Sequence, residues 1–413
     1  MPCKILISTT VAWTSTARHA AGFARAGCSV AAVAPEGAPV HASRYVSASH
    51  TYSPIFASSS LRTAIATAQP DLIVSCDDRA VANLRRLYAR EATDSAVAKV
   101  IERSLGEPAQ YARIMARETA IRIARGLGIR TPETLPIMTE QALDDCLRIV
   151  GLPAVLKADG SWGGEGVIVA KTREEAHQAW LKLANAPSRL RSAARAWKRH
   201  DAHCLMDAIA PKRRAVSIQK FIPGRPAASA FAAWNGEVVG AIYYDMLKTD
   251  GDIGPPSVIR RVDCPEIAEA TRLIARHFSL TGLHGIDFIR DNAGHVHLLE
   301  INPRATQGGT LAYGPGRDLA AALASCLMPS AKPRPAIAND TVVFFPGEWS
   351  LNPDSQYLKI GHHDVPWDDP IILRACLENM SRPAKASIAA VAHREMPFAA
   401  NSNIPSAAIA ARN

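Results

Sequence analysis

The first 90 residues alternate short apolar runs with helical patterns, and this alternation restricts the possible folds more than any other feature of the chain. Strands and helices are expected in turn at 4–9, 14–26, 29–34, 60–68, 71–76 and from there to about Tyr88. Strands that alternate with helices form a parallel sheet with helices on its faces. The turn STTVAWTST after the first strand has no glycine, so the dinucleotide-binding fingerprint is missing. We therefore interpret this part as a scaffold or substrate-side domain.

Length and composition set the broad class of the protein. The 413 residues suffice for two to four domains, and 48% hydrophobic with 21% charged residues is typical of globular proteins. The sequence contains no run of about 18 uncharged apolar residues, so we expect no transmembrane helix. The N-terminus does not resemble a signal peptide. The eight cysteines are scattered without a C-x-x-C pair, which indicates neither zinc nor a disulfide framework. We expect a cytoplasmic protein with reduced thiols, and its net charge of +9 favours anionic partners.

The rest of the chain continues as a mixture of helices and strands. A long helical pattern covers 107–128 and ends in RGLGIRTP, where Gly126 and Gly128 suit a helix end. Further strands are expected at 152–159, 166–171 and 215–222, helices from about 173 and over 265–279, and hairpins over 228–245 and 285–302. Asn235-Gly236 is typical of a hairpin turn. The proline-rich stretch from about 331 predicts a domain boundary.

The second hairpin carries polar groups where a buried strand should be aliphatic. Glu300 and Asn302 are two residues apart and therefore share one face of their strand, and the fold of the hairpin can bring Asp287 near them. Two carboxylates and an amide oxygen suit Mg²⁺ or Mn²⁺. Arg304, just past the strand, can then face an anion held by that metal. We predict a metal site at Asp287, Glu300 and Asn302 rather than an ordinary charged surface hairpin.

A second cluster, LKADGSWGGEGVIVA, predicts a phosphate-binding loop. Lys157 ends an apolar strand, and four glycines follow, Gly160, Gly163, Gly164 and Gly166. Glycines let backbone N–H groups approach phosphate oxygens, and the lysine adds a positive charge. The loop is no Walker A sequence, because no G-K-[ST] closes it. Alone the loop is weak evidence, since most such loops are turns, but the hairpin cluster strengthens it.

Together these residues resemble the ATP-grasp enzymes, from about Tyr111 to Gly309. Arg117 lies eleven residues before Gly128, the spacing of carbamoyl-phosphate-synthase-like and biotin-carboxylase-like members. The G-x-D-F-x…E-x-N-x-R pattern is the most specific match, at Asp287, Glu300, Asn302 and Arg304. The segment SIQKFIPG corresponds to the family's adenine-binding strand, which implies that Gln219, Lys220, Phe221 and Ile222 line the adenine. The acidic residue that often holds the ribose is absent from 223–230.

The resemblance implies an α/β fold of three parts. Residues 1–105 are a parallel α/β pre-ATP-grasp domain, and 106–330 are the two-subdomain ATP-grasp domain. Within it, about 131–222 form a small lid subdomain and 223–330 the metal-binding subdomain. Residues 331–413 are a C-terminal extension of unassigned role.

The resemblance also implies a reaction, in which ATP and Mg²⁺ activate a carboxylate as an acyl phosphate that an amine then attacks. Arg117 and Lys157 would neutralise phosphate charge, and Arg304 would stabilise the acyl phosphate or the tetrahedral intermediate. The partners are then a small carboxylate and an amine. We expect neither nucleic acid nor a membrane as a partner. The sequence leaves the oligomeric state open, a homodimer included.

Several alternatives stay open at this point. The protein could be a bicarbonate-using carboxyphosphate ligase, or a nucleotide-binding or nucleic-acid-binding protein that keeps the fold without turnover. A basic stretch at 188–214 is either a solvated helix face or a site for an acidic substrate. GHHDVPWDDP at 361–370 is either an exposed polar loop or a second metal site, and the role of Gln307 to Gly309 is undetermined.

Overall fold

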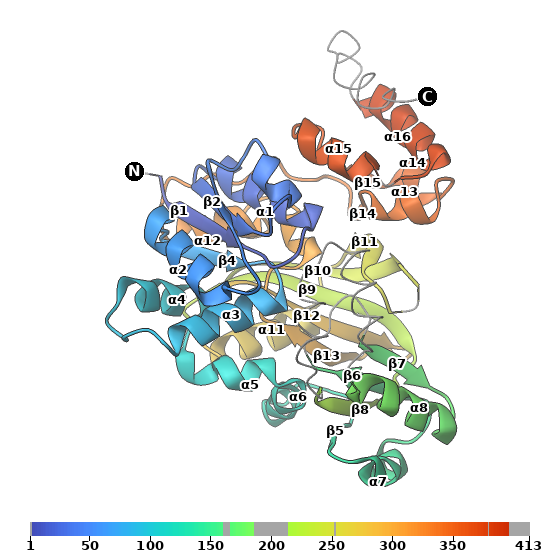
Figure 1. The fold of residues 1–413 in the computed structure, drawn as a ribbon. Coiled ribbons are helices and arrows are strands. Elements are labelled where there is room, and N and C mark those ends of the chain that lie inside the picture. Colours follow the sequence, from blue (N-terminus) through green and yellow to red (C-terminus); the bar gives the residue numbers. More distant parts are fainter. Residues whose placement is uncertain (1, 160–165, 186–213, 252, 379, 396–413) are drawn as a thin grey trace.

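The computed structural model describes residues 2–159, 166–185, 214–251, 253–378 and 380–395, and this part of the chain contains three sheets (Figure 1). The N-terminal sheet is parallel, in the order β3-β2-β1-β4. Its elements are β1 (Lys4–Ser8), α1 (Thr14–Arg25), β2 (Ser29–Ala34), η1 (Pro39–Ala42), β3 (Ala48–Thr51), α2 (Ala57–Ala68), β4 (Leu72–Ser75), α3 (Asp78–Tyr88) and α4 (Ala96–Leu105). The predicted parallel sheet is confirmed. The strand β3 escaped prediction because its sequence ASHT is polar and mostly exposed at the sheet edge.

The predicted long helix over 107–128 is wrong, because the chain breaks into η2 (Pro108–Gln110), α5 (Tyr111–Met115) and α6 (Arg117–Gly126). Ala116 interrupts the helical path with extended backbone at φ −85° and ψ 101°. The break makes Arg117 the first residue of α6. Its side chain is thereby buried rather than placed on a solvent-facing helix surface.

The second sheet is small and antiparallel, in the order β5-β8-β6-β7. It comprises β5 (Thr134–Ile137), β6 (Ala154–Ala158), β7 (Val167–Ala170) and β8 (Val216–Lys220), and α7 (Glu140–Val150) and α8 (Arg173–Ala184) pack against it. Leu143, Leu156 and Ile218 are fully buried between the helices and the sheet. This unit therefore has a core of its own.

The third sheet has seven strands, in the order β13-β12-β9-β10-β11-β14-β15. Its main elements are β9 (Gly224–Trp234), β10 (Glu237–Thr249), β11 (Pro256–Arg261), α11 (Pro265–His277), β12 (Gly282–Asp291), β13 (Val296–Asn302), η3 (Gln307–Thr310) and α12 (Leu319–Ser325). Both predicted hairpins are present. Asn235 and Gly236 have φ values of 49° and 84°, the left-handed pair that a tight hairpin turn requires.

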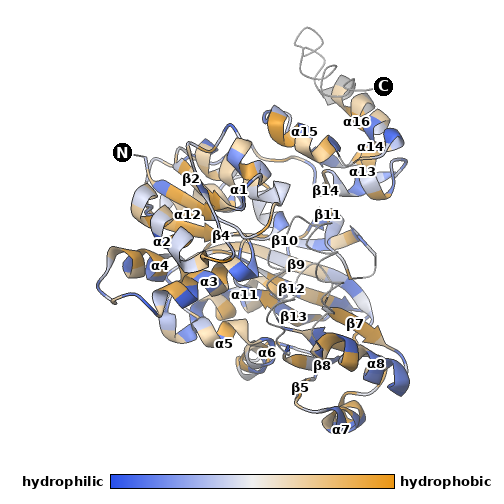
Figure 2. Ribbon diagram, in the orientation of Figure 1, coloured by the Kyte–Doolittle hydropathy of each residue, from blue (hydrophilic) through white to orange (hydrophobic). Residues whose placement is uncertain are grey.

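The C-terminal segment completes this third sheet. Its elements are β14 (Thr341–Phe344), α13 (Gly347–Leu351), α14 (Tyr357–Ile360), β15 (His362–Asp364), α15 (Pro370–Glu378) and α16 (Arg382–Glu395). The strand β14 pairs with β11, and β15 pairs with β14. One apolar core runs through the N-terminal sheet, the third sheet and the C-terminal helices, and includes Phe23, Phe344 and Trp349. Figure 2 shows the apolar strands β1 and β2 covered by helices of mixed polarity. The domain limits at 105 and 330 stay predictions.

The segment at 361–370 is neither a loose polar loop nor a metal cluster. Arg18 on α1 forms an ion pair with Asp364 and donates to its carbonyl oxygen, Arg25 pairs with Asp368, and the Ser43 hydroxyl donates to Asp369 at 2.5 Å. These acidic residues attach the C-terminal segment to the N-terminal unit. Among the residues that the structure describes, no helix is long and apolar enough to cross a bilayer.

Candidate functional site

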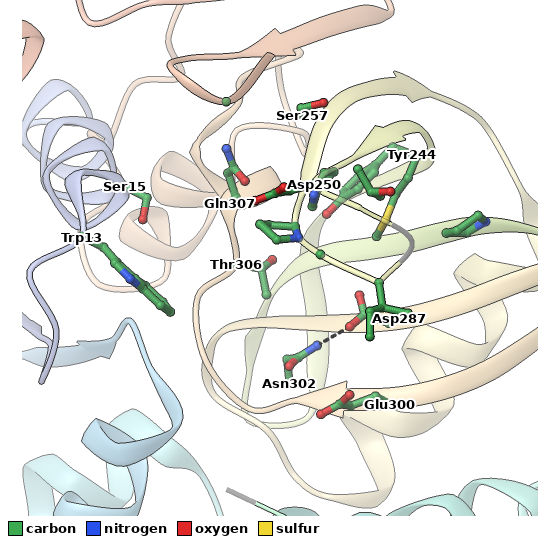
Figure 3. A pocket seen from close by; sticks show the side chains of 18 of the residues that line it. Trp13, Ser15, Tyr244, Asp250, Ser257, Asp287, Glu300, Asn302, Thr306 and Gln307 are labelled. Atoms are coloured by element: carbon green, nitrogen blue, oxygen red, sulfur yellow. Dashed lines mark hydrogen bonds between the residues drawn. The ribbon is translucent and has the colours of Figure 1, made fainter. Parts of the chain in front are cut away.

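The β12–β13 hairpin brings the predicted metal ligands together. Asp287 lies opposite Glu300 in the register, and Asn302 follows on the same face of β13. The Asn302 amide donates a hydrogen bond of 2.9 Å to Asp287 (Figure 3). Burial and the nearby Glu300 carboxylate raise the pKa of Asp287 to about 6. Two carboxylates and an amide oxygen at one place fit a hard divalent cation, which would relieve the repulsion between the carboxylates.

Two basic side chains from other elements approach Glu300. Arg117 donates to the Glu300 carboxylate at 2.6 Å and to the Ala158 carbonyl at 3.1 Å. Lys157, at the end of β6, is buried and lies 3.5 Å from the Leu299 carbonyl oxygen. Burial acts to raise the pKa of Glu300, but Arg117 and Lys157 hold it below its ordinary value. Burial lowers the pKa of Lys157 to about 8 despite the Glu300 charge.

Arg304 is held by a residue of the N-terminal unit. Its Nε donates to the Asp78 carboxylate at 2.9 Å, and its Nη2 lies 3.3 Å from Asn302 Oδ1. Asp78 is the first residue of α3, directly after the helix cap Asp77. The backbone N–H of Ala305 also donates to the Ser75 carbonyl of β4 at 2.9 Å. Sequence patterns did not reveal Asp78, because an acidic residue in the first turn of a helix is ordinary.

The predicted adenine segment and part of the glycine loop are also at the site. Gln219, Lys220, Phe221 and Ile222 all line the same cavity as Lys157 and Glu300. The buried Gln219 side chain donates to Thr134 Oγ1 at 3.0 Å. Gly166 accepts from the Ala158 N–H at 2.8 Å, next to Lys157. Gly160, Gly163 and Gly164, and the basic stretch except Arg214, lie outside the described residues.

The cavity has a volume of about 990 Å³ and extends well beyond these charged residues. One end holds Arg117, Lys157, Asp287 and Glu300. The other is lined by Asp250 and Ser257 and by residues that sequence analysis did not select, among them Trp13, Ser15, Arg18, Tyr244, Thr306, Phe345, Leu351 and Ile372. Gln307, which the sequence left undetermined, lines this end as well. Figure 3 shows Trp13, directly before α1, and Ser15 on α1 facing Tyr244, Asp250 and Ser257 across the cavity.

Solved structures, but no sequence family, resemble this chain. No protein-family model matches the chain, and no curated protein matches it by sequence. A biotin carboxylase domain of the 2-oxoglutarate carboxylase of Hydrogenobacter thermophilus, solved with MgADP, ADP and bicarbonate, is 14% identical with a TM-score of 0.55, over 81% of this chain and 71% of that one. The N5-carboxyaminoimidazole ribonucleotide synthetase of Thermus thermophilus is 17% identical with a TM-score of 0.56, over 81% of each chain. An L-amino acid ligase of Bacillus licheniformis is 15% identical with a TM-score of 0.53, over 79% of this chain and 75% of that one.

Proposed function

The chain has the ATP-grasp fold, and from this premise we propose that it is an ATP-dependent ligase that joins a carboxylate to an amine. The observation that carries the proposal is the meeting of Asp287, Glu300 and Asn302 with Arg117 and Lys157 at one end of a single cavity. Phosphoryl transfer requires carboxylates that hold a metal cation and positively charged side chains that neutralise the phosphates. Neighbours of this fold include a biotin carboxylase domain solved with bicarbonate and an L-amino acid ligase, which supports the class of reaction.

The nucleotide is proposed to lie between the second and third sheets. Gln219 to Ile222 would contact the adenine, and Arg117 and Lys157 would face the phosphates, with Gly160, Gly163, Gly164 and Gly166 beside them. Asp287, Glu300 and Asn302 would hold Mg²⁺ or Mn²⁺. The cation supplies charge neutralisation for the phosphates and relief for the crowded carboxylates.

Arg304 is proposed to act on the transferred phosphoryl group. It lies next to Asn302 and is fixed by Asp78, so its guanidinium is ready before substrate binds. The substrate carboxylate oxygen attacks the γ-phosphorus of ATP, and the bond to the ADP oxygen breaks. A neutral amine then attacks the acyl carbon, the bond to the phosphate oxygen breaks, and the amine loses a proton. Amide, ADP and inorganic phosphate leave.

A coupled assay for ADP with Mg²⁺ present tests the proposal. Pairs of amino acids and small carboxylates are supplied with and without bicarbonate, and products are identified by mass spectrometry. ADP release that needs both a carboxylate and an amine, and a product with the mass of their amide, is the expected result. Release that needs bicarbonate would assign the protein to the carboxyphosphate-using ligases, which the bicarbonate complex of one structural neighbour favours as second candidate. ATP binding without ADP release from any pair would leave a nucleotide-binding protein only.

A further inference from the structure

The cavity has a nucleotide end, which holds Arg117, Lys157, Asp287 and Glu300, and a second end beyond Arg304, here called the acceptor end. The acceptor end has more apolar walls than the nucleotide end. It is enclosed by the start of α1, the turn between β10 and β11, and the α13 and α15 segments of the C-terminal part. Its walls carry Trp13, Ile253, Phe345, Leu351 and Ile372. Ile253 and Leu351 are 44% and 47% exposed. Exposed apolar side chains are ordinary when they are scattered, but here two of them share one cavity with Trp13, Phe345 and Ile372, and such a gathering favours an apolar ligand.

The cations at this end, Arg18 and Arg304, both have an acidic partner. The Arg18 guanidinium contacts both the carboxylate and the backbone carbonyl oxygen of Asp364, and Arg304 forms an ion pair with Asp78. Burial and the neighbouring Arg334 and Arg18 lower the pKa of His19 to about 4, so this side chain is neutral. Apart from Arg304, which the proposed reaction uses for the transferred phosphoryl group, the lining residues that the structure describes at this end therefore present no further cation for a phosphate group on the substrate. Asp250 adds a further carboxylate.

Polar groups able to bind a carboxylate gather where the two ends meet. Thr306 and Gln307 follow Arg304 closely in the chain and line the cavity (Figure 3). A carboxylate placed here lies beside the guanidinium of Arg304.

We propose that this end of the cavity binds a carboxylate substrate with an apolar body and no phosphate group, such as a branched-chain amino acid or branched fatty acid. The carboxylate lies against Thr306 and Arg304, and the apolar body lies against Trp13, Leu351 and Ile253. Bicarbonate has no apolar part that could cover these side chains. A substrate with a phosphate group of its own would find no cation for that group at this end apart from Arg304. This inference rests on the ligase function proposed above and names its substrate class.

The test measures binding without turnover. Calorimetry is carried out on the full chain with Mg²⁺ and a non-hydrolysable ATP analogue, titrated with leucine, 4-methylpentanoate, acetate, bicarbonate, serine and O-phosphoserine. Either leucine or 4-methylpentanoate is expected to bind at least about 10-fold more tightly than acetate or serine, because several methylene groups enter an apolar pocket. Acetate, bicarbonate or O-phosphoserine binding as tightly as both branched ligands would overturn the inference, and so would the absence of binding by both branched ligands.

Two surface variants locate the binding. Leu351→Gln and Ile253→Gln should each weaken the branched ligand about 5-fold to 10-fold and leave the ATP analogue unaffected, because both side chains are already exposed and their loss does not disturb the core. Ile55→Gln is the matched control, since Ile55 is 70% exposed and does not line the cavity. Equal affinity in all three variants would contradict the placement. If the branched ligand binds as expected but no pair of substrates releases ADP, the ligase proposal falls while the substrate site stands.

Discussion

The two ends of the cavity handle charge in opposite ways. At the nucleotide end, buried charges crowd together and are incompletely matched: the pKa of Asp287 rises to about 6, and that of Lys157 falls to about 8, each through burial first. At the acceptor end, the buried Asp364 carboxylate has an ion-pair partner in Arg18, although burial still raises its pKa, and the remaining walls are largely apolar. This difference supports the proposal that one end binds ligands that bring charge and the other a ligand that brings apolar surface.

This difference predicts that charge-removing substitutions affect catalysis at one end of the cavity and folding stability at the other. A pKa displaced toward the neutral form means that the folded protein tolerates the charge at a cost, which a bound cation or phosphate can remove. A buried pair that is complete in the free protein contributes to the fold instead, and its disruption leaves a lone charge. Loss of a charge should therefore reduce catalysis at the nucleotide end and folding stability at the acceptor end.

The largest effect is expected from Glu300→Gln. The variant keeps the shape of the side chain but removes a proposed metal ligand and the partner of Arg117, so ADP release should fall about 10³-fold or more. Steady-state ADP release at saturating Mg²⁺ measures the loss. Glu269→Gln is the control, because Glu269 pairs with Arg272 on the surface and should leave turnover unchanged. Full turnover in Glu300→Gln would refute the assignment of the nucleotide end.

A smaller effect is expected from Asp78→Asn, which loosens Arg304 without removing it. If Arg304 acts only on the transferred phosphoryl group, kcat should fall about 10²-fold while KM for ATP stays unchanged. Asp78→Glu should restore part of kcat, because it keeps the charge that orients the guanidinium. Glu91→Gln, which removes an ion pair with Arg62 in the same unit but away from the cavity, serves as control. Parallel changes in kcat and KM, together with a lower thermal midpoint, would instead indicate a structural role for Asp78.

How far the sequence predicts this molecule also differs between the two ends. Asp287, Glu300 and Asn302 could be placed together because a hairpin has a period of two residues and a readable turn. Lys157 was found from its position before the glycine loop, and Arg117 through a family spacing, although the break at Ala116 that buries Arg117 was not foreseen. Trp13, Leu351 and Ile372 could not be found, because apolar residues in helices are ordinary core residues until long-range packing leaves them at a cavity. The sequence favoured an exposed loop around Asp364, because its partner Arg18 is 346 positions away and no local pattern connects the two residues.

At the acceptor end, Arg18→Gln should affect folding more than chemistry. Asp364 is buried, and burial raises its pKa even with Arg18 present. Without the Arg18 guanidinium, the buried carboxylate loses the positive charge that stabilises its ionised form. Because Arg18 is partly exposed, a loss of about 2 kcal/mol in the free energy of unfolding is expected, below the range for a fully buried pair. Urea denaturation at neutral pH measures it. Arg148→Gln, which breaks an exposed pair with Asp145, should change nothing measurable. A stability equal to that of wild type in Arg18→Gln would remove the contrast between the two ends.

The smallest expected effect is a pH dependence at the nucleotide end. Burial lowers the pKa of Lys157 to about 8 in the free protein, so its ammonium is lost as the pH rises above that value. Only the charged form attracts a triphosphate, and kcat/KM for ATP should therefore fall up to about tenfold per pH unit above pH 8. The kcat should stay flatter, because bound phosphates hold the proton on the lysine. In Lys157→Arg the guanidinium keeps its charge, and this decline should vanish even if the plateau is lower. The same decline in both proteins would show that another group titrates, and that the lysine is not poised for the charge of the nucleotide.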